Sequence, residues 1–216
     1  MAIGGHGSGV VRAQRAGGAQ AALRLLGLAL GLELAACVSV PRPAGVPASW
    51  PQRLSALQAL NRFELQGRLA ASNGADGFSA GLHWRQQGNE ASIDLSAPMG
   101  FGAAHIELGQ DRLQVTTSKG VTLDAAAARD ELRTSLGFEP PLDSLRYWLL
   151  GASDPSSGAQ ESLDAQQRLI HLEQAGWQVD YTEYSLVQQQ WLPRRLTVTR
   201  QSLRLRVVVN AWRLNS

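Results

Sequence analysis

The segment Gly67–Gly100, GRLAASNGADGFSAGLHWRQQGNEASIDLSAPMG, carries the strongest structural pattern in the chain. Apolar residues alternate in it with polar or small residues, and a period of two places the two sets on opposite faces of a strand. Asn73-Gly74 and Gly88-Asn89 interrupt the alternation with residues typical of hairpin turns. The segment therefore predicts an antiparallel meander with one apolar and one polar face, which ends at Pro98.

The same period recurs on both sides of this meander. It predicts about nine strands, at residues 62–72, 77–87, 90–97, 101–109, 112–118, 168–174, 177–185, 192–201 and 203–214. No two strands have the long spacing of a βαβ unit, so the predicted class is mainly antiparallel β. Residues 154–162 are polar and predict a loop.

Helical patterns occur in two places. Leucines at helical spacing predict a short amphipathic helix over 50–60. An insert at 124–150 interrupts the strands: Asp124 caps a run of alanines, Gly137 ends it, and a second, apolar helix follows. This insert is apolar enough on one side to cover the sheet.

A sheet of this size with a continuous apolar face must curl or be covered by helices. A curled sheet can enclose a small apolar ligand, with the insert 124–150 as its lid. The same residues can equally pack together as a filled core. The pattern alone leaves both arrangements open.

The first 36 residues have the plan of a secretory signal peptide. Arg12, Arg15 and Arg24 precede an apolar run, and small residues follow it up to Cys37. The run is shorter than the roughly 20 apolar residues that span a bilayer. Leu34-Ala35-Ala36-Cys37 resembles a bacterial lipobox, in which the cysteine receives a diacylglyceryl and an N-acyl group. The alternative is an ordinary cleaved leader with an incidental cysteine.

The residues after Cys37 contain Pro41, Pro43, Pro47 and Pro51, and such a segment stays extended. The predicted organisation is therefore a removed leader at 1–36, a lipid-anchored tether at 37–51 and a single β domain at 52–216.

Composition argues against several functions. Of the 20 basic and 18 acidic residues, three arginines and Glu33 precede Cys37, so the rest of the chain is neutral and has no electrostatic case for binding nucleic acid. One cysteine excludes an intrachain disulfide. His83, His105 and His171 lack the spacing of zinc ligands and are expected on strand faces. No nucleophile elbow or phosphate loop is present, so we expect no catalytic residue, metal or cofactor beyond the acyl groups.

A series of motifs follows in fixed order along the chain: FELQGRLA (63–70), GFSAGLHWRQ (77–86), APMG (97–100), PPLDSLRYWLLG (140–151), QAGWQVDYTEY (174–184), LPRRLTV (192–198) and Trp212. In order and spacing they are similar to the LolB family of outer-membrane lipoprotein receptors. The resemblance covers nearly the whole chain after Cys37. It implies a curled, incompletely closed β-barrel with a helical lid over an apolar cavity.

The resemblance also implies a function that is not enzymatic. LolB receptors take lipoproteins from the soluble periplasmic carrier LolA and insert them into the phospholipid of the outer membrane. The resemblance implies an anchor at the periplasmic face through the lipid on Cys37, and we expect the protein to be a monomer. A protruding Pro-Leu-Gly loop carries the apolar insertion residue of the family; here it is Pro98-Met99-Gly100, and methionine has a similar volume. The alternative for Met99 is a core position at a strand end.

We expect eight apolar residues to line or close the cavity for acyl chains: Phe63, Leu65, Leu82, Trp84, Ile93, Leu95, Trp148 and Trp177. The competing function is a structural or assembly lipoprotein with a packed β domain that binds a protein partner at a sheet edge. An open apolar cavity favours the receptor, and a filled interior favours the alternative.

Overall fold

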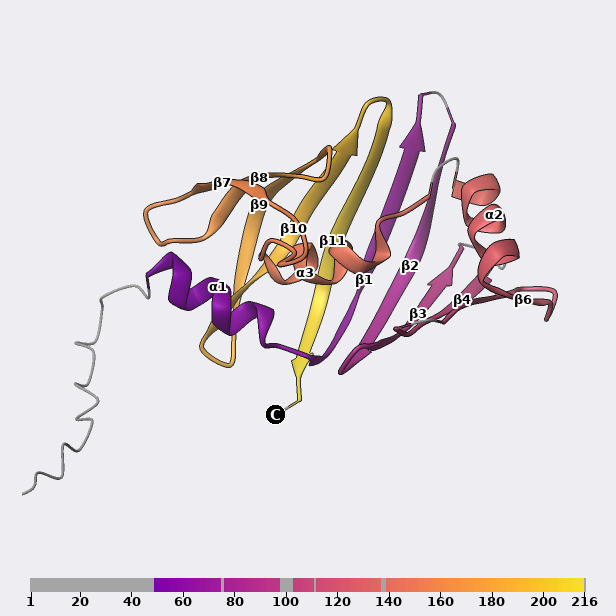
Figure 1. The fold of residues 1–216 in the computed structure, drawn as a ribbon, viewed down its shortest axis with the longest axis horizontal. Coiled ribbons are helices and arrows are strands. Elements are labelled where there is room, and N and C mark those ends of the chain that lie inside the picture. The colour runs from indigo at the N-terminus through magenta and orange to yellow at the C-terminus, as the bar shows by residue number, and fades with distance from the viewer. Residues whose placement is uncertain (1–48, 75, 98–102, 111, 137–138, 216) are drawn as a thin grey trace, which may run out of the picture. The chain divides into compact units, whose positions relative to one another are not determined.

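The alternating segments form one antiparallel sheet through the described part of the chain (Figure 1). The computed structural model describes residues 49–74, 76–97, 103–110, 112–136 and 139–215, all within the unit Gly45–Ser216. The strands are β1 (Arg62–Asn73), β2 (Asp76–Gln87), β3 (Glu90–Ser96), β4 (Ala103–Leu108), β5 (Leu113–Thr117), β6 (Thr122–Leu123), β7 (Ala159–Leu163), β8 (Leu169–Gln174), β9 (Trp177–Val187), β10 (Gln190–Arg200) and β11 (Leu203–Leu214).

The strands neighbour one another in the order β6-β5-β4-β3-β2-β1-β11-β10-β9-β8-β7. Two meanders, one from β1 to β6 and one from β7 to β11, are therefore joined where the first strand pairs with the last. Among the described residues no pairing joins the edge strands β6 and β7, so the sheet is not closed. The predicted class, a curled and incompletely closed antiparallel sheet with helices inserted mid-chain, is confirmed.

A row of directly opposed residues shows why the sheet takes this register. Leu65, Trp84, Ile93, Ile106 and Val115 face one another across five neighbouring strands, and each is at most 2 % exposed. Burying a large apolar side chain contributes about 1.5–3 kcal/mol. A slip of one residue would turn the set on a strand to the opposite face, so burial fixes the register.

Three helices accompany the sheet: α1 (Trp50–Gln58), α2 (Ala125–Leu136) and α3 (Leu142–Leu150). The predicted cap of α2 is confirmed, because the Ala127 N–H donates a hydrogen bond of 3.1 Å to Asp124 Oδ1. The predicted end of this helix at Gly137 lies outside the described residues. α3 ends at Gly151, whose left-handed φ of 76° suits glycine.

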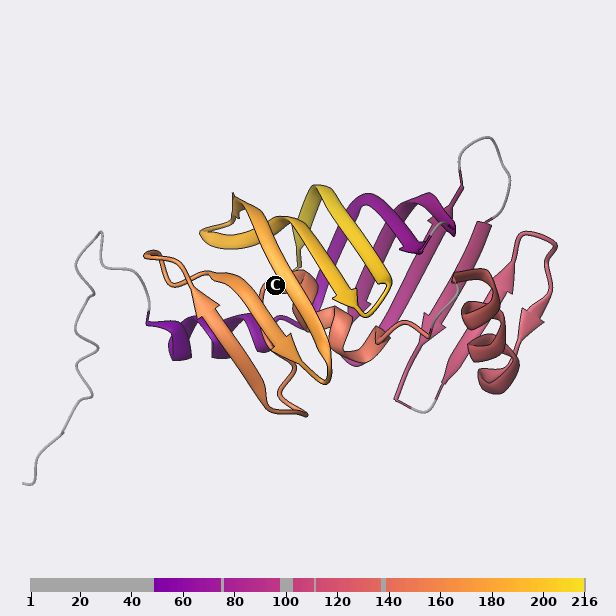
Figure 2. The ribbon, with the colours of Figure 1, turned by 90° about the horizontal axis from the view of Figure 1, so that it is seen from above.

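The helices lie in different places on the sheet. α1 and α3 occupy its concave side, as the two views in Figures 1 and 2 show. α3 packs against β10 and α1, whereas α2 packs against β5 and β6. The insert is therefore not a single cover: α3 lies over the middle of the concave side and α2 over one end. None of the three helices combines the length and the apolar composition that crossing a bilayer requires.

Two parts of the strand prediction are wrong. The segment 154–162, expected to be a loop, contains most of β7, and a two-residue β6 follows β5, so the described sheet has eleven strands rather than about nine. β7 pairs with β8, but its sequence AQESL is largely exposed and has no apolar alternation. A period of two appears in the sequence only where one face of a strand is buried, so it does not predict an edge strand that is polar on both faces.

Candidate functional site

An apolar pocket lies on the concave side of the sheet, beneath α3. Its volume is about 40 Å³, and only apolar side chains line it. The sheet contributes inward-facing residues of five strands, and the other wall comes from α3 and the segment before it. The lining residues are Leu69, Ala71, Phe78, Leu82, Trp84, Ile93, Leu95, Ile106, Pro140, Leu142, Leu145, Leu149, Leu205 and Val207.

Four of the eight residues predicted to line a cavity come together here: Leu82, Trp84, Ile93 and Leu95. The period of two along β2 and β3 brings them to one face, and the pairings Leu82–Leu95 and Trp84–Ile93 place them opposite each other. Leu95 is the most accessible of the four, and the other three are buried.

Three other predicted residues lie in a packed region beside the pocket. Phe63, Leu65 and Trp148 are fully buried. The Phe63 ring contacts the ring of Trp212 at 5.8 Å between centroids, and Trp148 lies 6.3 Å from Trp177 in the same way. These side chains hold the sheet and α3 together rather than line the apolar pocket. The predicted lipidation site Cys37 and the predicted insertion residue Met99 lie outside the described residues.

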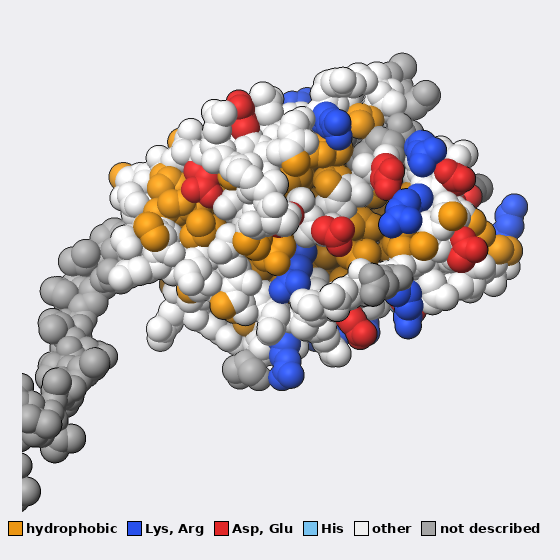
Figure 3. Space-filling model, in the orientation of Figure 1, with side chains coloured by type: hydrophobic (Ala, Val, Ile, Leu, Met, Phe, Trp, Pro, Cys, Tyr) orange, Lys and Arg blue, Asp and Glu red, His pale blue; other side chains and the backbone are white. Residues whose placement is uncertain are grey.

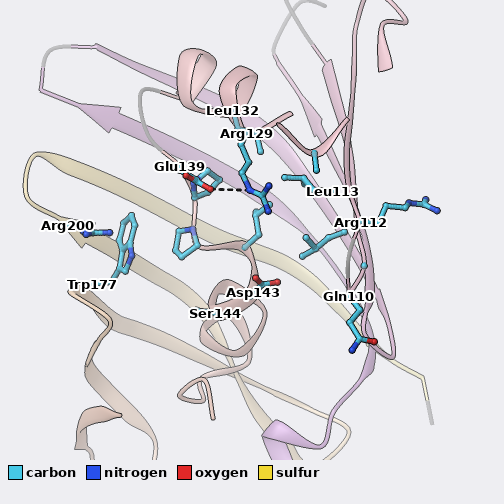
Figure 4. A pocket seen from close by; sticks show the side chains of 16 residues that line it. Gln110, Arg112, Leu113, Arg129, Leu132, Glu139, Asp143, Ser144, Trp177 and Arg200 are labelled. Carbon is cyan, nitrogen blue, oxygen red and sulfur yellow. Dashed lines mark ion pairs between the residues drawn. The ribbon is translucent and has the colours of Figure 1, made fainter. Parts of the chain in front are cut away.

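A second, larger cavity of about 640 Å³ opens next to the apolar pocket (Figure 4). Trp177, the last of the eight, lines this cavity, with Arg200 stacked over its ring at 5.4 Å. Polar and charged side chains from several elements complete the lining. The lining residues are Leu108, Gly109, Gln110, Arg112, Leu113, Ala125, Arg129, Leu132, Glu139, Pro140, Pro141, Leu142, Asp143, Ser144, Trp177 and Arg200.

Pro140 and Leu142 line both cavities, so the segment before α3 is the wall between them. An ion pair of 3.5 Å joins Glu139 in this segment to Arg129 on α2 (Figure 4). Both side chains are about half exposed, so this pair is worth at most about 1 kcal/mol. On this side of the domain, Figure 3 shows apolar side chains exposed among charged residues of both signs. The Arg129–Glu139 ion pair therefore contributes little to holding the wall in place.

The far end of α3 is held much more firmly, by a buried glutamine on β8. Gln174 is 2 % exposed, and its Oε1 accepts hydrogen bonds of 2.9 Å from Trp148 Nε1 and from the Asp154 backbone N–H. Its Nε2 donates to the backbone carbonyls of Asp154 at 2.8 Å and Ser157 at 2.9 Å. The side-chain amide thus uses both donor hydrogens and both acceptor positions, which fixes the end of α3 to the sheet.

Two ionisable groups support this attachment. The Tyr181 hydroxyl donates a hydrogen bond of 3.0 Å to the Trp148 carbonyl, and burial raises the pKa of Tyr181 well above its usual value, so it remains a neutral donor. Burial would raise the pKa of Asp154. Hydrogen bonds from the Ser156 backbone N–H and the Ser144 hydroxyl outweigh burial and lower that pKa. Asp154 is therefore an anion that links the start of α3 to the loop after it.

The size of the pockets decides what the site can hold as it stands. Pockets for small ligands have volumes of about 300–1,000 Å³. The apolar pocket is far smaller, so in this conformation its side chains nearly fill it, whereas the neighbouring cavity falls within the range. Moving the wall at Pro140 and Leu142 would join the two into one site with an apolar floor and a charged rim.

The sequence pattern did not reveal the residues that control access to the pocket. Pro140 and Leu142 belong to a motif that was expected to form a lid, but periodicity does not show that they separate two cavities. Gln174 is the last residue of β8 and is buried. A polar residue at a buried strand position needs hydrogen-bond partners, so it was the one feature of the sequence that indicated this network. Within the described ranges, no group of three or more His, Cys, Asp or Glu side chains could hold a metal ion.

A single antiparallel sheet curled around a helix, with an apolar pocket beneath that helix, defines a class of protein. The fold is similar to that of the LolA superfamily protein from Nitrosomonas europaea (TM-score 0.51, 9 % identity, 78 % of this chain and 94 % of that one). It is also similar to a putative outer membrane lipoprotein-sorting protein domain from Vibrio parahaemolyticus (TM-score 0.53, 11 % identity, 77 % and 91 % of the chains). The fold is thus similar to that of LolA superfamily proteins.

Sequence comparison identifies the family within this class. The family model for outer membrane lipoprotein LolB matches residues 61–212. The outer-membrane lipoprotein LolB of Alkalilimnicola ehrlichii is 36 % identical over 89 % of this chain and 96 % of its own, and that of Nitrosococcus oceani is 35 % identical over 84 % and 92 %. The chain belongs to the LolB family of outer-membrane lipoproteins. The resemblance of the motifs is therefore confirmed.

Proposed function

We propose that this protein receives lipoproteins from a LolA-like periplasmic carrier, shields their acyl chains beneath α3 and inserts them into the outer membrane. Membership of the LolB family supports this receptor role. The observation that carries the proposal is the apolar pocket under α3, which shares the wall Pro140–Leu142 with a larger, open cavity.

The chemistry of the cargo requires such a site. Each methylene group of an acyl chain costs about 0.8 kcal/mol to expose to water, so a chain of a dozen or more carbons needs continuous shielding while it moves between carrier and membrane. The inward faces of β1–β4 and β11 offer an apolar surface of the right kind. The arginine-rich cavity beside them suits the polar end of the cargo.

Loading requires the site to open, and the unequal attachment of α3 defines how. Trp148 at the end of the helix is held by Gln174 and Tyr181, whereas the start has the Ser144–Asp154 hydrogen bond and the exposed Arg129–Glu139 pair. We expect the segment 139–145 to swing away while the end near Gly151 acts as the hinge. The direction of transfer then follows from increasing affinity from carrier to receptor to membrane.

The remaining assignments concern Cys37 and Met99, which lie outside the described residues, and properties of the protein as a whole. Cys37 carries the diacylglyceryl and N-acyl groups, and residues 37–51 tether the domain 52–216 to the periplasmic face of the outer membrane. Met99 enters the phospholipid when cargo is deposited. The protein works as a monomer, needs no cofactor or nucleotide, and has no enzymatic activity. The absence of a phosphate-loop motif in the sequence supports transfer without nucleotide.

The test is to mix the purified chain with lipoprotein-loaded LolA-like carrier and to measure how much cargo moves. Leu95→Asp places a carboxylate at the accessible side of the apolar pocket, and we expect it to lower transfer at least tenfold, because a charge without a partner is costly in an apolar site. Ile170→Asp is the matched control, since Ile170 is 44 % exposed and lines no part of the pocket. Equal transfer by both variants would contradict acyl-chain binding at this site.

A second function is favoured by one observation, the small volume of the apolar pocket. With about 40 Å³ of free space, the interior is close to the filled core that a structural or assembly lipoprotein would have. Such a protein would bind a partner through the exposed edge of β6 or β7. Transfer of cargo to the wild-type chain decides between the two functions, because a permanently filled core accepts no acyl chain.

A further inference from the structure

The outward face of the sheet carries three exposed arginines at one end, Arg68 on β1 and Arg204 and Arg206 on β11. Their neighbours in sequence, among them Leu69, Leu205 and Val207, point inward and are buried, so the strand period sends the arginines to the opposite face. Arg68 lies opposite Val208 in the β1–β11 pairing. Diagonal neighbours in such a pair are about 7–8 Å apart, so the three side chains form one group, the arginine patch.

Among the side chains that the structure describes, no carboxylate forms an ion pair with these three arginines. The carboxylates on the neighbouring strands of the outward face have other partners: Asp180 pairs with His171 at 2.7 Å, and Glu183 pairs with Arg195 at 3.3 Å. The three guanidinium groups are therefore available to an external anion, although the chain after the leader is neutral as a whole.

The surface beside the patch is flat and uncharged. In the register of β1, β2 and β3, the outward positions next to the arginines are Ser72, Gly77, Ser79, Gly81 and Ser96. A Cβ atom on Gly81 would lie 2.6 Å from Ser96 Oγ, so the serine side chain closes over the bare backbone there. This surface of small side chains, bordered by the three arginines, is more complementary to an extended planar surface than to a protruding side chain or loop of a partner protein.

The patch lies close to the segment that was predicted to enter the membrane. Arg68 is level with Gly81 on β2, and Gly81 is level with Ser96, the last residue of β3. Two strand spacings, about 10 Å, therefore separate Arg68 from the strand that leads into residues 97–102. The turns of β1–β2 and β10–β11 lie at this same end of the sheet (Figure 1).

We infer that the arginine patch docks the domain on anionic phospholipid headgroups and so orients the segment around Met99 toward the bilayer. The inference rests on the proposed function, which anchors the chain to a membrane. The tether between Cys37 and α1 spans at most roughly 45 Å when extended, so it keeps the domain near the bilayer without determining which side of the domain faces it. Attraction to anionic lipid increases affinity about fivefold per arginine, and this attraction falls off within a Debye length. The patch can therefore determine which side of the domain faces the bilayer.

The test uses the lipidated chain in vesicles of phosphatidylethanolamine and phosphatidylglycerol at about three to one. A fluorophore on Ser79→Cys reports contact with lipid headgroups through quenching by a headgroup nitroxide. We expect strong quenching that disappears in vesicles of phosphatidylcholine alone, or in 0.5 M salt. Replacing Arg68, Arg204 and Arg206 with glutamine should lower the preference for contact by about a hundredfold, from the fivefold effect per arginine.

Arg62, Arg85 and Arg213 form the matched control, because they are exposed arginines on β1, β2 and β11 at the other end of the sheet. Their replacement with glutamine changes the charge equally and should leave the quenching intact. Quenching that survives in the patch variant, or that is equal in the two lipids, would overturn the inference. A patch variant with normal quenching but no acceptance of cargo from the carrier would show a protein-docking surface instead.

Failure of the proposed function is distinguishable from failure of this inference. Acceptance of cargo from loaded carrier is measured separately with the unlipidated chain in solution, without vesicles, and we expect the patch variant to match the wild type there. If the wild type accepts no cargo, the receptor function fails, whereas the quenching result still reports which face meets the lipid.

Discussion

At the residue scale, single polar side chains decide how the apolar elements are held. Gln174 satisfies four hydrogen-bonding groups around the end of α3, and it does so from a position that faces the core. Buried polar groups without a partner are costly. A network of this kind therefore defines one position for the helix end, where apolar packing alone would allow several.

Gln174→Leu should destabilise the domain by about 2–4 kcal/mol, because it leaves Trp148 Nε1 and the Asp154 N–H buried without an acceptor. Denaturant unfolding of the variant measures this loss. Gln178→Leu is the matched control, since Gln178 is an exposed residue two positions into β9, and it should change stability by less than about 0.5 kcal/mol. Similar losses for both variants would contradict the structural role of Gln174.

His171 should make stability depend on pH. A hydrogen bond from its ring to Asp180, at 2.7 Å, raises the pKa of His171 above its usual value, with a smaller effect from Glu173. A raised pKa in the folded state means that the stabilisation is complete below the usual value, and is lost as the pH rises through the folded pKa. His171→Gln should therefore cost more stability at about pH 5.5 than at about pH 8.5.

Urea unfolding of wild type and variant at the two pH values measures this difference. Asp180→Asn should remove most of the same pH dependence, because Asp180 is the main partner of the imidazole. A cost of His171→Gln that is the same at both pH values would show that the pair contributes no proton-linked stability.

At the scale of elements, sequence pattern was informative wherever a strand has one buried face. Strands β1 to β5 of the first meander were predicted within a few residues, because their apolar positions alternate, whereas the two-residue β6 was missed. The edge strand β7 was missed because both of its faces are largely polar. Of the eight residues predicted to line the cavity, four line the apolar pocket, whereas Phe63, Leu65 and Trp148 are packed beside it. Alternation shows which face of a strand a residue is on, but it does not distinguish a residue packed in the core from one that lines a pocket.

The hinge of α3 gives a prediction at this scale. Gly151 has a φ of 76°, and a Cβ there would lie 3.0 Å from Pro193 Cγ and 3.2 Å from the Tyr184 hydroxyl. Gly176 has the same φ, but a Cβ on it would meet nothing closer than Arg200 Nε at 4.0 Å. Gly151→Ala and Gly176→Ala therefore share a backbone cost of about 1–2 kcal/mol.

Gly151→Ala should destabilise the domain by a further 1–3 kcal/mol or so, from overpacking against Pro193. Thermal and denaturant unfolding of the two variants, measured side by side, isolates this packing contribution. Equal stability of the two variants would mean that the end of α3 can shift freely, which contradicts a fixed hinge.

At the scale of the whole domain, an open sheet makes a receptor possible. In the described sheet β6 and β7 are the edge strands and do not pair with each other, and α2 and α3 connect these edges along the chain, so the helices can move without breaking the sheet. In the described structure only about 40 Å³ of apolar space is free beneath α3. The fold class could be predicted from sequence, but the nearly filled pocket could not, because it depends on how side chains from distant elements fill a shared volume.

The most direct test of the account is the distance between α3 and the sheet as cargo binds. Spin labels on Asp143→Cys, at the exposed start of α3, and on Asn210→Cys, on the outward side of β11, report this distance by pulsed electron resonance. A second pair, Gln178→Cys with Asn210→Cys, lies within the sheet and serves as the control. We predict that lipoprotein delivered by its carrier lengthens the first distance and leaves the second unchanged. Bound cargo with an unchanged Asp143–Asn210 distance would contradict the movement of α3 away from the sheet on loading.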